Sequence, residues 1–283
     1  MTAKRDTRGL IFKAMLMSCL GISVLLLFVL VIDTATDGAG ALSLDFLTNP
    51  PSRLADRAGI GPALAGTLWL MVVCAIFIVP VGVASAIYLE EYADRTKWWN
   101  RMIEVNIQNL AAVPSIVYGI LGLAFIVRGP LDLGRVVLAG ALTLGLLVLP
   151  VVIIASREAI RAVPPSIREG SLALGATQWQ TIWRQVLPSS VPGIATGVIL
   201  ALSRAIGETA PLIVIGAATY IAFNPTGLDS AFTAMPIQIF NWISQPQDDF
   251  KLKAAAGILV LLGVLMLMNS IAIYLRNRYE KKW

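Results

Sequence analysis

Apolar residues gather along this chain in six long runs that are separated by polar stretches. An α-helix rises 1.5 Å per residue, so runs of this length can cross a hydrocarbon core of about 30 Å. We therefore predict an all-α, polytopic membrane protein with about six transmembrane helices, at Ala14–Ile32, Thr67–Leu89, Leu110–Val127, Val136–Ser156, Val191–Ile215 and Ala254–Leu275.

Two apolar segments differ from ordinary spans, the first in its basic flank and the second in its length. The first run follows basic residues, as a signal peptide would, but it is longer than the 7–15 residues typical of a signal-peptide core, and the triplet at residues 39–41 (Ala-Gly-Ala) lies well downstream. We expect a retained helix there. The segment Ala231–Ser244 has 14 residues, contains Pro236 and is too short to span. Because Trp242 suits a membrane interface, we expect a re-entrant or surface-lying segment.

The composition agrees with a chain surrounded by lipid. Of 283 residues, 57% are hydrophobic and 14% are charged, whereas a soluble domain carries roughly 25% charged residues. The net charge of +5 comes from basic residues between and beyond the apolar runs, and no Lys/Arg-rich stretch with interleaved aromatics is present. This distribution argues against a nucleic-acid partner and leaves the lipid bilayer as the surrounding medium.

The basic residues also predict an orientation in the membrane, because cytoplasmic loops carry an excess of Lys and Arg. Fifteen of the 22 Lys and Arg residues lie in the two termini and in the loops 90–109 and 157–190. Six lie in the other loops, and Arg204 lies inside a run. Both termini are therefore expected in the cytoplasm, as an even number of helices also requires.

Residues that most catalytic sites need are missing. The chain has no histidine, which excludes Ser-His and Cys-His catalysis and His-ligated metal sites. Cys19 and Cys74 lie in separate apolar runs without metal-site spacing. The chain also lacks the nucleotide-binding motif GxxxxGK followed by Ser or Thr. We expect no enzyme, no metal and no cofactor on this chain, so that any dependence on ATP must come from a partner.

The loop at residues 164–190, between the fourth and fifth runs, is rich in helical signals. A pair of prolines ends any preceding helix, and Ser166 stands three residues before Glu169, which is the spacing of a capping box. Apolar residues then recur at helical spacing on both sides of Gly175. The pattern predicts two short amphipathic helices that are hinged at Gly175 and end at Pro188. A helix pair lying in the membrane interface would show the same periodicity.

The spacing in this loop resembles the EAA motif of ABC importer permeases. In that family a Glu and two small residues are followed by Gly and later by Leu-Pro. The residues at these positions are Glu169, Gly170, Gly175, Leu187 and Pro188. Gly170 and Ser171 replace two alanines and remain small, whereas Gln185 replaces an isoleucine. The resemblance implies the fold of a type I (MetI-like) permease, in one domain over residues 1–283 with a core at 64–275, and a loop that docks on an ATPase.

Three further segments resemble the phosphate branch of these permeases: residues 87–92 (IYLEEY), 113–119 (VPSIVYG) and 204–211 (RAIGETAP). The final Ala-Pro is typical of the PstA type of subunit rather than the PstC type. The resemblance implies a bacterial inner-membrane permease that forms the path for inorganic phosphate in an ATP-driven importer. It also implies three partners: a PstC-like permease, a PstB-like ATPase dimer that binds ATP and Mg, and an extracytoplasmic PstS-like phosphate-binding protein.

Two charged residues, Arg204 and Glu208, lie inside the fifth apolar run, four positions apart and so on one face of a helix. Each costs about 2.5–3.5 kcal/mol at the centre of a membrane helix, so the pair must face protein or water. The pair is either a structural link between helices or a lining for the path of an anion, where a guanidinium offers forked donors to an oxyanion. Ser115 is a further candidate for this path.

Two other functions fit the same features. One is a permease of the same class for another oxyanion, such as sulfate or molybdate. The other is an ion-coupled secondary transporter, in which Glu208 would be the site of the proton or sodium ion. A neighbouring reading frame that carries the nucleotide-binding motif would favour the permease over the carrier.

Overall fold

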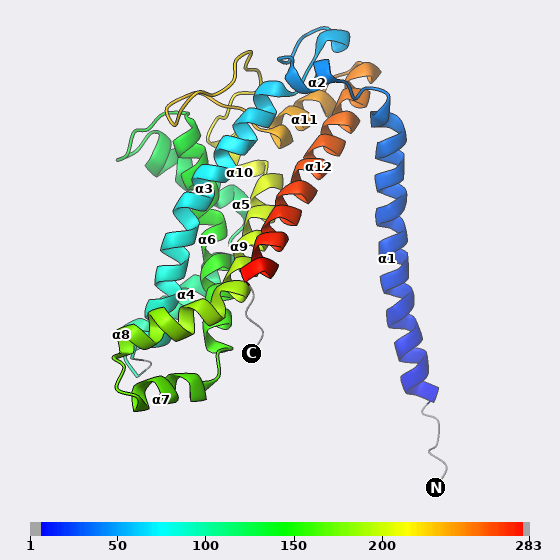
Figure 1. Cartoon of the computed structure of the whole chain (residues 1–283). Helices are drawn as coiled ribbons and strands as arrows, with labels where there is room; N and C mark the ends of the chain where they lie inside the picture. Colours follow the sequence, from blue (N-terminus) through cyan, green and yellow to red (C-terminus); the bar gives the residue numbers. More distant parts are fainter. Residues whose placement is uncertain (1–6, 95, 280–283) are drawn as a thin grey trace.

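The computed structural model describes residues 7–94 and 96–279, and its regular elements in these ranges are helical (Figure 1). Five helices are long and apolar enough to cross a membrane, and a bent pair of helices brings the total to six. The long helices are α1 (Thr7–Ala39), α3 (Gly61–Ile87), α6 (Val137–Arg161), α9 (Leu187–Gly207) and α12 (Asp248–Tyr279). The prediction of an all-α, polytopic membrane protein is confirmed.

The third predicted span is wrong as a single helix. The structure places Leu110 in α4 (Trp98–Ala111), which is followed by α5 (Ser115–Leu121) and a π-helical turn, η3 (Gly122–Val127), at an angle of 109° to α4. Pro114 causes the break, because it donates no backbone hydrogen bond and disfavours helical geometry at the residue before it. The 13 residues of Ser115–Val127 cover only about 20 Å, less than a hydrocarbon core.

Helix α6 forms the centre of the bundle, with α3 and α9 packed against it. Small residues allow these helices to approach closely, as is common between membrane helices. A Cβ at Gly82 of α3 would lie 2.7 Å from Val152 of α6, and Gly197 of α9 faces Ala155 of α6 in the same way. Side chains from the three helices form the main core cluster, including Leu70, Ile78, Leu144, Val148 and Ala201.

Helix α1 stands apart from the bundle along most of its length (Figure 1). It meets α12 near its C-terminal end, where Gly38 lies against the backbone of Ala255 and Ala256. The most apolar part of α1 has no buried residue. A helix that is apolar on all sides and makes no wider contact with its own chain is suited to lipid or to a second membrane subunit.

The end of the bundle at which α3 begins carries α2 (Leu44–Thr48), a 3₁₀ turn, η1 (Ala55–Arg57), and α11 (Met235–Ile243). Helix α11 lies within the predicted 231–244 segment, but the expected interfacial tryptophan is wrong. Trp242 is 2% exposed and packs against Phe46, with ring centroids 5.7 Å apart. The hydroxyl of Thr67 in α3 accepts a hydrogen bond from the Met235 backbone and so ties the start of α11 to the bundle.

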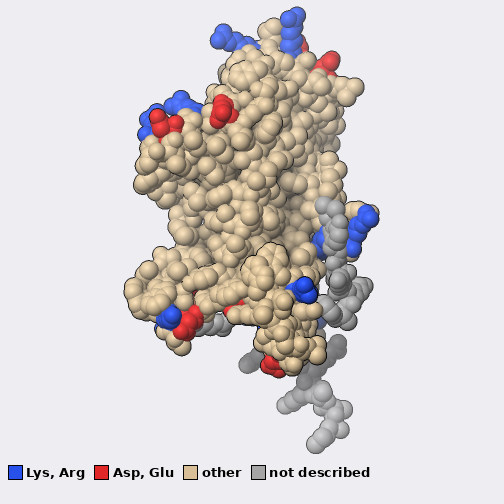
Figure 2. All heavy atoms as spheres, turned by 60° about the vertical axis from the view of Figure 1, so that its left-hand side comes forward, with Lys and Arg blue, Asp and Glu red and all other residues tan. Residues whose placement is uncertain are grey.

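The N-terminal end of α1, the C-terminal end of α12 and the loop with α7 (Pro165–Ala173) lie at one end of the molecule, opposite α11 (Figure 1). The described ends of α1 and α12 therefore lie on the same side of the molecule as this loop. On the face in Figure 2, most charged residues lie towards the two ends, and further Lys or Arg residues lie at the right-hand edge near mid-height. Several residues counted for the orientation lie outside the described ranges, namely Lys4, Arg5, Arg95, Lys281 and Lys282.

Candidate coupling loop and substrate path

The predicted hinge at Gly175 is confirmed. Helix α7 ends with Gly175 in the left-handed region at φ = +84°, where the Gly175 amide donates to the Leu172 carbonyl and the Ala176 amide donates to the Ser171 carbonyl. These two bonds form a Schellman C-cap, which favours glycine at the left-handed position. The chain then turns into α8 (Gln178–Thr181), so the loop contains the two short helices that the pattern predicts.

The capping box lies at a different place from the one predicted. Helix α7 begins at Pro165 after Pro164, without a side-chain cap, so Ser166 and Glu169 do not form the box. The box is present at the start of α8, where the Thr177 hydroxyl and the Gln180 side chain each accept a backbone hydrogen bond. Proline suits the first turn of a helix because its missing donor would have no partner there.

The predicted helix end at Pro188 is also wrong. Residues Gln178–Gly207 form one continuous helical stretch, in which a π-helical turn, η4 (Ile182–Val186), joins α8 to α9. The Leu187 amide donates to the Ile182 carbonyl across this turn, and Pro188 sits in the first turn of α9. A π turn next to a proline relieves the clash that the ring would make in a regular helix. The loop is therefore joined rigidly to the fifth span.

The loop presents apolar side chains to its surroundings. Leu174 is 91% exposed, and Trp179 and Trp183 are exposed and contact each other with ring centroids 5.2 Å apart and ring planes tilted by 57°. Glu169 and Gly170 are exposed on α7, whereas Leu187 and Pro188 are half-buried. A groove of about 430 Å³ separates α7 from α8 and η4, and it is lined in part by Ile167, Gly170, Leu174, Gln180 and Arg184. Exposed apolar residues around a groove are typical of a protein interface.

A buried ion-pair network supports the loop from the membrane side. Arg157 of α6 is 6% exposed and contacts Glu90 at 2.8 Å and Glu104 at 2.7 Å. Arg161 contacts Glu90 at 2.7 Å. Glu90 lies in a π-helical turn, η2 (Tyr88–Tyr92), and Glu104 lies in the middle of α4, so these contacts join α6, η2 and α4.

Two further side chains attach the loop itself to η2. The Arg168 guanidinium on α7 contacts the Glu91 carboxylate at 2.9 Å and donates to the carbonyls of Ile160 and Val163. The Gln178 side chain on α8 donates to the Glu91 backbone carbonyl at 2.6 Å. Sequence reasoning missed these roles, although adjacent glutamates after one span and arginines after another are a signal that could have found them.

The Arg204–Glu208 pair is present but lies at a break in the fifth span. The Arg204 Nε atom is 3.3 Å from the Glu208 Oε1 atom. Helix α9 ends at Gly207, Glu208 is extended at φ = −74° and ψ = 120°, and α10 (Ala210–Val214) follows. The expected common face of one helix is therefore wrong. The cause is Pro211, whose ring would clash with the Gly207 carbonyl in a continuous helix and which cannot donate to it.

The break after α9 packs against the other broken span. A Cβ at Gly119 of α5 would lie 2.7 Å from the Pro211 Cα atom, so α5 and α10 touch through their backbones. Tyr118 of α5 is buried, its hydroxyl donates to the Leu110 carbonyl across the bend, and it lies within electrostatic reach of Arg204. Broken helices that meet inside a membrane protein are a usual setting for substrate sites.

The predicted path residues are only partly brought together. Arg204 and Glu208 form the pair, with side chains that are 43% and 18% exposed in this chain alone. Ser115 begins α5 and is half-buried, but no hydrogen bond joins it to either member of the pair within the described ranges. In α9 the Ser203 hydroxyl is bonded to Asn269 of α12 at 2.7 Å, which fixes the helix one position before Arg204.

The arrangement of helices is similar to that of solved ABC importers. A permease chain of a bacterial alginate ABC transporter, in complex with its periplasmic protein, matches with a TM-score of 0.68 and 19% identity over 99% of this chain and 98% of that one. A chain of the MetNI methionine ABC transporter matches with a TM-score of 0.60 and 15% identity over 76% of this chain and 94% of that one. At these identities the likeness concerns the fold.

Similarity in sequence extends over most of the chain. The probable ABC transporter permease protein YqgI of Bacillus subtilis is 31% identical over 87% of each chain. The phosphate transport system permease protein PstA 1 of Mycobacterium tuberculosis is 35% identical over 77% of this chain and 70% of its own. The corresponding PstA of Yersinia pestis is 32% identical over 85% and 80%. Residues 78–281, which hold the loop, the ion-pair network and both broken spans, match one family model, and the chain belongs to that family, the binding-protein-dependent transport system inner membrane components.

Proposed function

We propose that this chain forms the membrane path for inorganic phosphate in an ATP-driven importer. The observation that carries this proposal is the identity of 32–35% to phosphate transport permeases over 77–85% of the chain. The Arg204–Glu208 pair at the contact of two broken spans agrees with an anion as the substrate. A sulfate or molybdate permease would use the same fold, and an ion-coupled carrier would use Glu208 without an ATPase.

The pair offers a simple way to handle an anion. One contact of 3.3 Å holds the guanidinium of Arg204 through its Nε atom, and the terminal nitrogens have no partner within the described ranges. These nitrogens can donate to a phosphate oxygen while Glu208 keeps the side chain in position. When no anion is present, Glu208 balances the charge of Arg204, which lowers the cost of holding it inside the membrane.

The α7–α8 loop is the proposed contact with a PstB-like ATPase dimer. Its exposed leucine and its groove support an interface, and the binding of ATP and Mg is assigned to that partner rather than to this chain. A PstC-like permease and an extracytoplasmic PstS-like protein complete the proposed assembly. The loop, the N-terminal end of α1 and the C-terminal end of α12 lie at one end, and the segments that carry most basic residues adjoin them. We therefore propose that this end faces the cytoplasm, with the chain in a bacterial inner membrane.

Side-chain contacts and a continuous helix connect the α7–α8 loop to the Arg204–Glu208 pair. Arg168 and Gln178 hold the loop to η2, and Arg157 holds η2 to α4 and α6. The second half of the loop continues without a break into α9, which ends next to Arg204 and Glu208. Displacement of α7–α8 by an ATPase would therefore shift α9 and α6 together.

Uptake of labelled phosphate by vesicles that contain the assembled complex tests the proposal. We expect uptake that needs ATP inside the vesicles and the binding protein outside, and that excess sulfate or molybdate does not inhibit. Uptake that a proton or sodium gradient drives without ATP would contradict the proposal in favour of a carrier. Preferential uptake of sulfate or molybdate would keep the permease but refute the substrate.

A further inference from the structure

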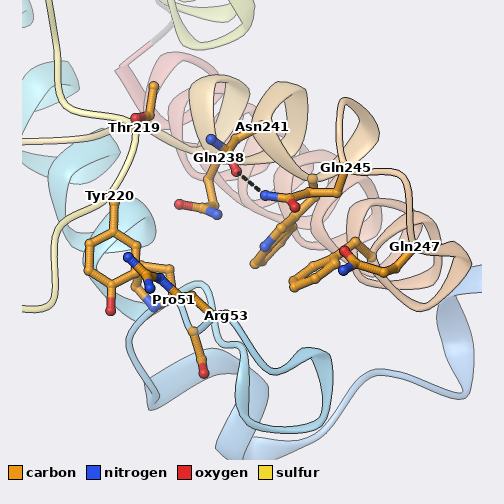
Figure 3. Close-up of a pocket in the computed structure, with 11 residues that line it drawn as sticks. Pro51, Arg53, Thr219, Tyr220, Gln238, Asn241, Gln245 and Gln247 are labelled. Carbon is orange, nitrogen blue, oxygen red and sulfur yellow. Dashed lines mark hydrogen bonds between the residues drawn. The ribbon is translucent and has the colours of Figure 1, made fainter.

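A second polar pocket lies at the α11 end of the molecule, opposite the α7–α8 loop (Figure 3). It has a volume of about 470 Å³ and lies between the stretch 51–53, the stretch 219–220, α11 and the turn into α12. We call it the α11 pocket. Its polar lining consists of Ser52, Arg53, Thr219, Tyr220, Gln238, Asn241, Gln245 and Gln247.

Gln238 is the buried polar group of this pocket. The residue is 2% exposed, its Oε1 atom has no hydrogen-bond partner, and its amide group makes no side-chain hydrogen bond within the described ranges. Figure 3 shows the side chain extending from α11 into the pocket. Burying an amide without a partner is unfavourable, so a side chain in this state indicates a group that binds there. The amide NH2 group can donate to an anion's oxygen, and the Oε1 atom can accept from a protonated oxygen of the same anion, as in HPO4²⁻ or H2PO4⁻.

The neighbouring amides are arranged as donors. The Asn241 Oδ1 atom accepts a hydrogen bond from the Gln245 side chain at 3.3 Å (Figure 3). Among the described residues the Asn241 amide nitrogen has no acceptor, so it can donate to a ligand. Thr219 and Tyr220 line the side of the pocket across from α11. Polar side chains from several elements therefore line one space.

The charge in the pocket has one sign. Arg53 is the charged residue among those that line the pocket, and no carboxylate lines it. Within the described ranges Arg53 makes no ion pair, whereas the nearby Lys251 is paired with Asp248 at 2.7 Å. A guanidinium without a counter-ion beside neutral donors attracts an anion with several oxygen atoms.

We propose that the α11 pocket is an oxyanion-binding site, separate from the Arg204 pair and at the opposite end of the permease from the coupling loop. Arg53 supplies the charge, and Gln238 with Asn241 supplies neutral donors from α11. That the anion is inorganic phosphate rests on the proposed function. The pocket would hold phosphate at the end where an imported anion enters and raise its local concentration at the mouth of the path.

Protection of a cysteine against an impermeant thiol reagent tests the site. The probe is inorganic phosphate, and the reporter is Thr219→Cys in the full complex without Cys19 and Cys74. A site with one guanidinium and partial access to water is expected to bind at about 1 mM, so about 10 mM phosphate would slow labelling roughly tenfold. Chloride at equal ionic strength should leave the rate unchanged, and so should phosphate at Leu44→Cys, an 81% exposed position outside the pocket.

Two arginine variants form a matched pair. Arg53→Gln and Arg57→Gln remove the same charge from the same stretch of chain, but only Arg53 lines the pocket. We expect Arg53→Gln to abolish protection of Thr219→Cys and Arg57→Gln to retain it. Gln238→Met, which keeps the volume and removes the amide, should also reduce protection while the protein remains folded.

Several results would overturn the proposal. Labelling that phosphate does not slow would refute it, and so would equal loss of protection in the two arginine variants. Protection that appears only when the binding protein is added would show a docking surface instead of an anion site. The assay needs neither ATP nor transport, so its failure is distinct from a failure of phosphate uptake, which would refute the proposed function alone.

Discussion

Replacing Gly175 by alanine should weaken the binding of the ATPase without any steric clash. A Cβ at Gly175 would meet nothing within 4 Å, but the residue has φ = +84°, where an L-residue with a side chain costs about 1–2 kcal/mol. That cost lowers the ratio of the observed loop conformation to its alternatives roughly 5- to 30-fold. If the ATPase binds the observed conformation, its apparent affinity falls with the fraction of permease in that conformation, and so by up to the same factor.

Gly263 provides the control for this prediction. It lies inside α12, outside the loop, and a Cβ there would also meet nothing within 4 Å. Gly263→Ala should therefore favour its helix by about 0.5–1 kcal/mol and leave the C-cap of α7 intact. Gly175→Asn should fall between wild type and Gly175→Ala, because asparagine tolerates the left-handed region better than alanine.

Titration of the solubilised permease with the ATPase subunit measures these affinities. We expect Gly175→Ala to bind more weakly than wild type, by up to roughly 5- to 30-fold, and to couple ATP hydrolysis poorly to uptake. Equal affinity for Gly175→Ala and Gly263→Ala would refute the reasoning, since it would mean that the loop docks in another conformation or does not dock.

Two further predictions concern the ion pairs and the orientation. Arg157→Met should destabilise the protein by about 1–3 kcal/mol in detergent-mediated unfolding, because the buried Arg157 bridges Glu90 and Glu104 and, among the described residues, only Glu90 keeps a second partner, Arg161. Arg161→Met, at a side chain that is 46% exposed, leaves Glu90 paired with Arg157 and should cost less than about 1 kcal/mol; equal costs would refute the role of burial. In cells, Leu44→Cys should react with an impermeant thiol reagent and Leu174→Cys should not, both positions being highly exposed in the chain; the reverse pattern would invert the proposed topology.

The number and type of spans followed from the sequence because burial in lipid demands long apolar runs wherever they occur. The breaks within spans did not follow, since apolar runs continue across Pro114 and Pro211 while the backbone cannot. The same limit applies at Pro188, where a proline read as a helix end is accommodated by a π turn. A proline in an apolar run is compatible with a kink, a break or a first turn, and packing decides among them.

The coupling loop was likewise predicted in part from the sequence. Gly175 was recognised as a hinge because its neighbours have helical periodicity, and the Schellman cap confirms it. The ties from Arg168 and Arg157 to Glu91 and Glu90 were missed, because they join residues more than 60 positions apart in the sequence. The burial of Trp242 was missed because a short apolar segment next to a span can pack on the helix bundle or lie in the membrane interface, and the sequence pattern is the same in both cases.

The central claim is that Arg204 acts on phosphate in an ATP-driven permease, and uptake per assembled complex in Arg204→Gln tests it most directly. Loss of charge-assisted hydrogen bonds to the anion should reduce phosphate uptake roughly ten- to a hundredfold while the complex still assembles at normal levels. The exchange Arg204→Glu with Glu208→Arg should not restore uptake, because the positive charge then lies beyond the end of α9. Normal uptake in Arg204→Gln, or recovery of uptake in the exchanged double variant, would contradict the claim and leave the pair a structural link.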